Sequence, residues 1–171
     1  FRRFLARIIY KYLDQEKMKA LYNKAMHYYE DKKNYFAALK FADLLKNREQ
    51  IALQIDRLLS QKLGYDVFLS LEEYCLHLSD VYLEEYPRLV MAKAMLQAME
   101  GDLPAFRKCE QFLNRMLENC LPEKGRQIRK CQLFLKLIGP GGMTPELLEE
   151  AQELADQVYT SVDVMWDQLL V

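Results

Sequence analysis

The sequence predicts an all-α protein, and three observations support this. Hydrophobic residues make up 51% of the 171 residues and aromatic residues 12%, enough to build a sizeable core. The chain has only 6 glycines and 5 prolines, too few for the many tight turns of an all-β fold. Apolar side chains also recur at helical spacing, and we therefore expect about ten helices. The first such stripe contains Phe4, Leu5, Ile8, Ile9 and Tyr12.

Each expected helix begins or ends at a residue that suits that place. Asp14 can cap a helix that follows the apolar stripe of residues 1–13. Gly64 can end the helix that begins near Arg48. Pro87 interrupts a short helical turn, because a proline disfavours helical geometry in the residue before it. Helices are expected in this part at residues 15–31, 35–45, 48–63, 68–78 and 81–86.

The second half of the chain shows similar boundary signals. Gly101 can end one helix and Asp102 can cap the next, with Pro104 in its first turn. After "GPGG" at 139–142, Thr144 and Pro145 can begin the last long helix. We interpret "GPGG" as a loop and not a phosphate site, since no GK[ST] follows it. Helices are expected here at residues 88–100, 103–120, 124–138 and 145–162.

The formal net charge of −1 conceals a segregation of charge along the chain. Residues 1–64 sum to +7, residues 65–86 to −6, residues 87–136 to +5 and residues 137–171 to −7. Neighbouring helices of opposite sign would attract one another in a stacked array, which is our first interpretation. The alternative is a basic N-terminal face reserved for another domain or for nucleic acid.

The sequence offers few candidates for metal binding or catalysis. The four cysteines lie in apolar helical patterns without CxxC spacing, so we expect buried free thiols. Neither histidine, His27 or His77, has the context of a metal ligand or a general base. The acidic pairs Glu72-Glu73 and Glu84-Glu85 fit a solvated face. We expect no metal, no cofactor and no catalysis in this segment. The cysteines are Cys75, Cys109, Cys120 and Cys131.

No apolar run approaches the length of about 20 residues that spans a bilayer, and the first residues lack the charged, apolar and small-residue order of a secretion signal. We therefore expect a cytoplasmic chain that does not enter a membrane. Because the sequence begins with Phe1, we expect it to be a piece of a larger protein.

Two stretches match the helical hairpin of tetratricopeptide (TPR) repeats, in which small and aromatic residues recur at set positions. Small residues let two helix backbones approach, and units of this kind must stack to bury their faces. We therefore expect TPR-like hairpins forming a right-handed α-α superhelix. The expected helix-crossing core residues are Ala25, Tyr28, Ala37 and Phe41 in the first stretch, and Ala92, Leu96, Ala105 and Cys109 in the second.

Over residues 1–115 the order of these elements resembles the helical part of MalT-like regulators, the large ATP-dependent members of the LuxR family of bacterial transcription factors. "FRRFLARIIYKYL" looks like the end of their winged-helix arm, and "KNREQIALQIDRLL" like a short unit that follows. Asn47-Arg48 departs from the Gly-Asp that is usual in that unit. Further matching positions are Leu21, Ala25, Tyr28, Tyr29, Tyr35, Ala38, Leu39, Ala42, Pro87, Leu89 and Ala94.

The resemblance implies a division of the chain and of its roles. Residues 1–13 would end the arm, 14–138 would form the repeats, and 139–171 would add a C-terminal helical hairpin. ATP would bind only a separate upstream domain, and a downstream domain would bind DNA. This segment would sense an inducer or a protein partner, contact its neighbouring domains and support self-association. Its acidic C-terminal end argues against direct binding of nucleic acid.

Tyrosines are the candidate lining of a ligand or partner groove, since tyrosine offers a large contact area with a polar tip. Packing between helices is the competing interpretation of the same residues. A second functional hypothesis is a stand-alone TPR-type scaffold with no role in transcription, and a third is a helical enzyme. The candidate groove residues are Tyr22, Tyr29, Tyr74 and Tyr82.

Overall fold

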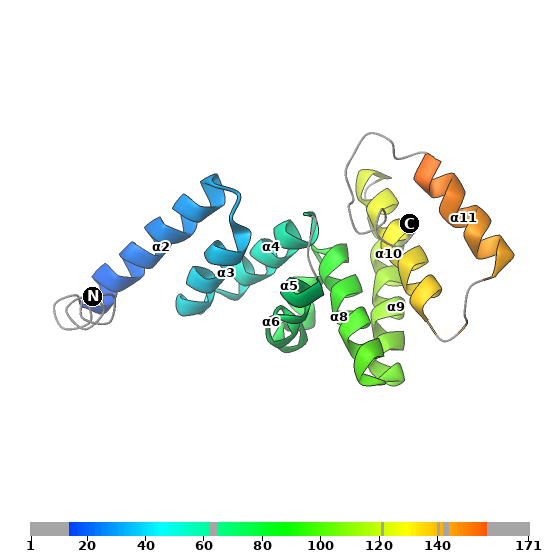
Figure 1. Ribbon diagram of the computed structural model, residues 1–171, viewed down its shortest axis with the longest axis horizontal. Coiled ribbons are helices and arrows are strands. Elements are labelled where there is room, and N and C mark those ends of the chain that lie inside the picture. The colour runs from blue at the N-terminus through cyan, green and yellow to red at the C-terminus, as the bar shows by residue number, and fades with distance from the viewer. Residues whose placement is uncertain (1–13, 62–64, 121, 140, 142–143, 157–171) are drawn as a thin grey trace. The chain divides into compact units, whose positions relative to one another are not determined.

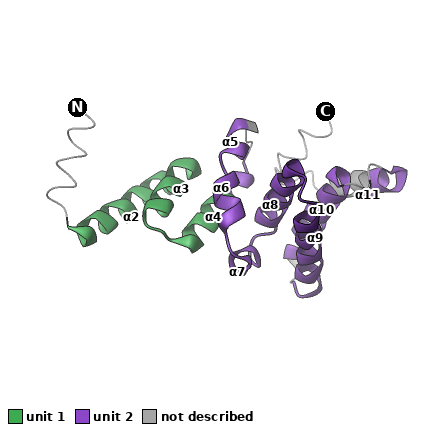
Figure 2. Ribbon diagram, turned by 90° about the horizontal axis from the view of Figure 1, so that it is seen from below, with its two compact units in different colours: residues 1–55 green, residues 56–171 purple. Residues whose placement is uncertain are grey.

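The computed structural model describes residues 14–61, 65–120, 122–139, 141 and 144–156 (Figure 1). All regular secondary structure in these ranges is α-helical, without a strand, which confirms the all-α prediction. The chain divides into two compact units, Phe1–Ile55 and Asp56–Val171 (Figure 2). This division falls inside the stretch 14–138 that we expected to form one array. The expected end of an arm at residues 1–13 lies outside the described residues.

The first unit contains α2 (Gln15–Asp31), α3 (Tyr35–Leu44) and most of α4 (Arg48–Leu59). Asp14 caps α2 as predicted, because its carboxylate accepts a hydrogen bond from the backbone N–H of Lys17 at 2.8 Å. α4 ends at Leu59, earlier than the sequence predicted. The residue proposed to end it, Gly64, lies outside the described residues.

The turn between α2 and α3 and the turn between α3 and α4 have the same local structure. Lys33 and Lys46 both adopt a φ of 54°, in the left-handed region, and each is followed by an asparagine. The side-chain oxygens of Asn34 and Asn47 each accept a hydrogen bond of 3.2 Å from the backbone N–H three residues later. The asparagine caps the next helix immediately after the turn, so each connection between helices stays short.

α2 and α3 pack through aromatic rings and small residues. The rings of Tyr29 and Phe41 stack, with centroids 5.7 Å apart and planes at 14°. Tyr22 approaches the same Phe41 ring at 6.1 Å. Ala38 and Ala42 are completely buried, so their small side chains allow close packing of α3 in the core of this unit.

The second unit carries the remaining helices. They are α5 (Tyr65–Leu69), α6 (Glu72–His77), α7 (Asp80–Leu83), α8 (Pro87–Glu100), α9 (Leu103–Glu118), α10 (Pro122–Ile138) and α11 (Pro145–Asp156). The prediction of one helix over 68–78 is wrong, since α5 and α6 are separate. The Ser70 hydroxyl donates to the carbonyl of Val67 at 2.6 Å, a local bond that competes with helix continuation, and Leu71 is fully buried at the break.

α8 is the central helix of this unit, and α6, α7, α9 and α10 all pack on it. Figure 1 shows α6, α9 and α10 beside it. Gly101 ends α8 with a φ of 78°, and the Asp102 side chain caps α9 by accepting from the N–H of Ala105 at 3.1 Å, both as predicted. Thr144 caps α11 by accepting from the N–H of Leu147 at 3.3 Å. None of the described helices is both long and apolar enough to cross a membrane.

Tyr28 is the exception among the predicted helix-crossing residues. It is 57% exposed, and its ring meets that of Tyr29 edge-on at 5.4 Å, so its placement in the buried core is wrong. Adjacent residues point about 100° apart on a helix, so Tyr28 turns away when Tyr29 faces α3. Of the others, Ala92, Leu96 and Cys109 are buried, and Ala25, Ala37, Phe41 and Ala105 are half-buried.

Replacing Gly101 by alanine is expected to lower the free energy of unfolding by about 1 kcal/mol, because a β-carbon disfavours the left-handed conformation. No atom lies within 4 Å of the added β-carbon, so the loss measures backbone conformation alone. Gly125→Ala is the comparison variant, since Gly125 lies in the helical backbone of α10 and its added β-carbon would make only an ordinary contact, 3.4 Å from Sγ of Cys120. Urea unfolding of both variants checks this, and equal stabilities would contradict it.

Candidate functional site

The predicted tyrosine groove is not present as one site within either unit. Tyr22 and Tyr29 lie in the first unit, where both pack against Phe41 between α2 and α3. Tyr74 on α6 and Tyr82 on α7 are half-buried in the second unit. For Tyr22 and Tyr29 the structure therefore shows interhelix packing.

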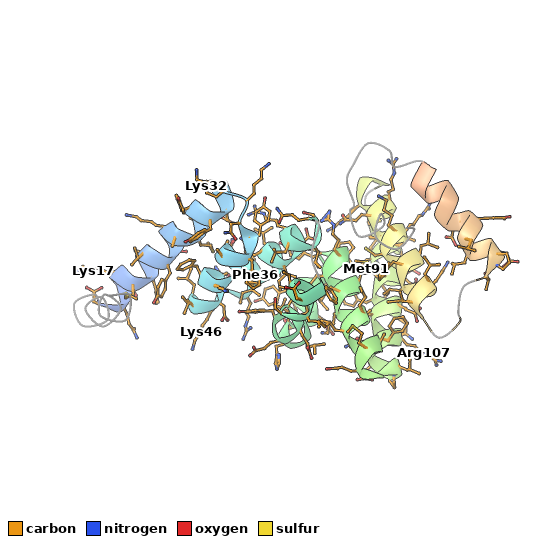
Figure 3. All side chains as sticks on the ribbon, in the orientation of Figure 1. Lys17, Lys32, Phe36, Lys46, Met91 and Arg107 are labelled. Carbon is orange, nitrogen blue, oxygen red and sulfur yellow. The ribbon has the colours of Figure 1, made fainter. Side chains whose placement is uncertain are left out.

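A concave site that the sequence did not indicate lies between α9 and α10, with a volume of about 370 Å³. Two cations, one carboxylate, three amides and one leucine line it. The lining residues are Arg107, Glu110, Gln111, Asn114, Gln132, Leu135 and Lys136. We call this site the α9–α10 groove. Figure 3 labels Arg107 on α9, where its side chain is exposed.

Helical spacing places the α9 residues of the groove in one row. Arg107, Gln111 and Asn114 follow one another at i, i+4 and i+7, the spacing of a single helix face. Seven residues of helix rise about 10 Å, which sets the length of this wall. Asn114 joins the opposite wall directly, since its Oδ1 accepts a hydrogen bond from Nε2 of Gln132 at 2.7 Å.

The other end of the groove is charged. Lys136 on α10 forms an ion pair with Glu150 of α11, with Nζ and Oε2 3.3 Å apart. About half of each side chain remains exposed, at 53% for Lys136 and 52% for Glu150, so water screens this pair. Leu135, which is 1% exposed, anchors the floor of the groove in the core.

The α9–α10 groove could not be recognised from the sequence because its residues resemble an ordinary solvent face. α9 is strongly amphipathic, with Phe106, Cys109 and Leu113 buried on the opposite side. The only signal was the row of amides on the polar side, and the partner of Asn114 lies 18 residues away on another helix. Helix pairing in three dimensions, not local spacing, creates the site.

A second polar cluster lies within the second unit and joins Asp56, the first residue of that unit, to residues of α8 and α10. Arg88 of α8 pairs with Asp56 of α4, with Nη1 and Oδ2 3.1 Å apart. With its amide oriented for bonding, Oε1 of Gln127 on α10 accepts from Arg88 at 3.0 and 3.1 Å. Both charged side chains are largely covered, at 22% and 18% exposed. The covered side chains of this cluster leave little access for a ligand.

Two of the buried thiols, those of Cys75 and Cys109, are not activated for catalysis. Burial raises the pKa of Cys75 to about 12 and that of Cys109 to about 11, and the positive charge of Lys93 only partly offsets this. A nucleophilic cysteine requires a lowered pKa. Both thiols therefore remain protonated near neutral pH. Sγ of Cys109 donates a hydrogen bond to Oε1 of Gln97 at 3.2 Å, and Cys75 is a fully buried packing group.

Other candidates from the sequence have local partners. Nδ1 of His27 lies 2.7 Å from Oε2 of Glu30, and Nδ1 of His77 lies 2.6 Å from the backbone oxygen of Glu73 on its own helix. Within the described ranges, no group of three or more His, Cys, Asp and Glu side chains is arranged to hold a metal ion.

The pKa of Cys75 predicts a pH dependence of stability. The unfolded thiol ionises near its ordinary value of 9.0, whereas the folded thiol keeps its proton up to about pH 12. The folded state thus binds more protons between these values, so the free energy of unfolding falls as pH rises above 9. Cys75 alone contributes a slope of up to about 1.4 kcal/mol per pH unit.

In Cys75→Ala the free energy of unfolding is expected to fall less steeply with pH. Urea unfolding at a series of pH values above 9 measures this. The variants are compared by the slope of the free energy of unfolding against pH. Their absolute stabilities are not compared, because the substitution also changes packing. Cys120→Ala serves as the control, since the Cys120 thiol is only half-buried. Identical slopes in the two variants would contradict the prediction.

Comparison of the chain with protein-family models, with curated protein sequences and with solved structures gives no significant match. Function is therefore inferred from the residues and motifs of this chain itself.

Proposed function

We propose that this chain is a non-catalytic regulatory segment of a MalT-like member of the LuxR family of bacterial transcription regulators. In this proposal its TPR-like hairpins stack into a right-handed superhelix that binds an inducer or a protein partner and supports self-association. The family assignment is supported by the motifs of residues 1–115, including "FRRFLARIIYKYL" and the positions from Leu21 to Ala42.

The α9–α10 groove is the observation that carries the binding role. Its volume of about 370 Å³ suits a small molecule or a few residues of peptide. Amide and charged side chains line it, which can recognise a ligand by directed hydrogen bonds and by charge. A regulatory site has to recognise its ligand without transforming it, and the amide and charged side chains of the groove are suited to that.

An exposed apolar pair on α2 favours a protein partner over a small inducer. Leu21 is 43% exposed and Tyr28 57% exposed, and they lie seven residues apart on the same side of the helix. Large exposed apolar and aromatic side chains that share one face are typical of protein contacts. The same observation also fits the alternative function, a stand-alone TPR-type scaffold without a role in transcription.

The proposal assigns the chemistry of the whole regulator to other domains. ATP would bind an upstream module, DNA a downstream one, and this segment would carry the signal between them in the cytoplasm. In the part of the chain that the structure describes, the arrangement of helices supplies surfaces and a groove for such contacts.

The coding sequence on either side of this segment tests the proposal. We expect a P-loop, GxxxxGK[ST], upstream and a helix-turn-helix domain downstream. Flanks that contain only further helical repeats would contradict the transcriptional role and favour the scaffold. A catalytic domain other than the P-loop module, fused directly to the segment, would contradict both.

A further inference from the structure

We propose that the α9–α10 groove binds an acidic peptide segment, one of whose carboxylates replaces Glu150 as the partner of Lys136. This inference rests on the proposed function as a binding segment and adds the class of ligand. It makes α11, which carries Glu150, an internal competitor for the same cation.

The charges of the groove favour a ligand with carboxylates. Arg107 is exposed and forms no hydrogen bond or ion pair with any of the described residues. Nζ of Lys136 already donates to the carboxylate of Glu150 at 3.3 Å, which shows that it is positioned to bind a carboxylate. Guanidinium and ammonium groups both form charge-assisted hydrogen bonds with carboxylates. Two cations at one end of the groove can therefore bind two acidic side chains.

The amides of the groove favour a peptide over a small acid. Gln111, Asn114 and Gln132 each carry both donors and an acceptor, the groups that a peptide backbone needs. The wall of α9 is about 10 Å long, and an extended chain covers that distance in about three residues. A simple dicarboxylate would reach the cations but would leave the amide end unused.

The carboxylates that the protein itself has in and beside the groove argue against nucleic acid as the ligand. A nucleic acid carries a negative charge at every nucleotide, so several phosphates would lie against Glu110 and the acidic face of α11. These like charges would repel one another. A peptide needs only one or two carboxylates, at the positions of Arg107 and Lys136. The remaining contacts can be neutral.

α11 is suited to be displaced from Lys136. Of the described helices, α11 packs chiefly on α10, and Leu148 at the end of its first turn is still 43% exposed. The ion pair between Lys136 and Glu150 is half-exposed, and a pair of this kind changes a binding constant by about fivefold at most. A ligand that also engages Arg107 can therefore compete with Glu150.

Fluorescence anisotropy with a short labelled peptide tests the proposal on the intact chain. The peptide carries two glutamates separated by serine, and the control peptide carries glutamine in their place. We expect only the acidic peptide to bind, and to bind more weakly at high ionic strength. Arg107→Gln and Lys136→Gln should each weaken binding about fivefold. Glu150→Gln should strengthen it by up to a similar factor, because the competitor is gone.

Matched variants separate these effects from a general change of charge. Lys108→Gln removes an exposed cation from α9 outside the groove, and Glu149→Gln removes an exposed carboxylate beside Glu150. Both should leave the affinity unchanged, and circular dichroism should show that all variants remain folded.

Three results would overturn the proposal: no binding of the acidic peptide, equal binding of both peptides, or equal effects of the groove and control variants. An unchanged affinity in Glu150→Gln would overturn the competition by α11. Each of these results concerns the ligand, whereas the flanking coding sequence tests the regulatory function independently.

Discussion

The burial of α8 on several sides is the constraint on which the second unit depends. A helix that packs against α6, α7, α9 and α10 must be apolar over most of its circumference. α8 meets this requirement. Its buried residues are Pro87, Leu89, Val90, Met91, Ala92, Ala94 and Leu96. Alanines among them allow close approach of the neighbouring helices. Figure 3 labels Met91, which is 6% exposed on this helix.

The same packing makes the α9–α10 groove a defined surface. α9 and α10 both pack on α8 and on each other, so their inner faces are fixed by the core and their outer faces form the groove. Phe106 is completely buried on α9, and its ring lies 3.4 Å from where a β-carbon on Gly139 would sit. The polar residues outside therefore project from two helices whose spacing is set by apolar contacts. A rigid scaffold of this kind favours selective binding.

The boundaries of helices were predictable because they depend on local chemistry. Asp14, Gly101, Asp102 and Thr144 act within three or four residues of themselves, and the structure shows each in its predicted role. The break between α5 and α6 was missed because the local bond from Ser70 to Val67 gives no distinct signal in the sequence, and the burial of Leu71 at the break depends on the fold. The groove was missed for the same reason, since its opposite walls are brought together only by folding. Seven of the eight positions taken from the repeat pattern are buried or half-buried, but the pattern could not determine on which side of α2 each aromatic ring lies.

Native-state hydrogen exchange of α8 tests this account most directly. If α8 organises the second unit, its central amides should exchange only through global unfolding, with the largest protection of any helix in that unit. The amides of α11, which packs chiefly on α10, should exchange through local opening at a lower free energy. Exchange of the α8 amides as fast as those of α11 would contradict the central role of α8, and with it the fixed geometry of the groove.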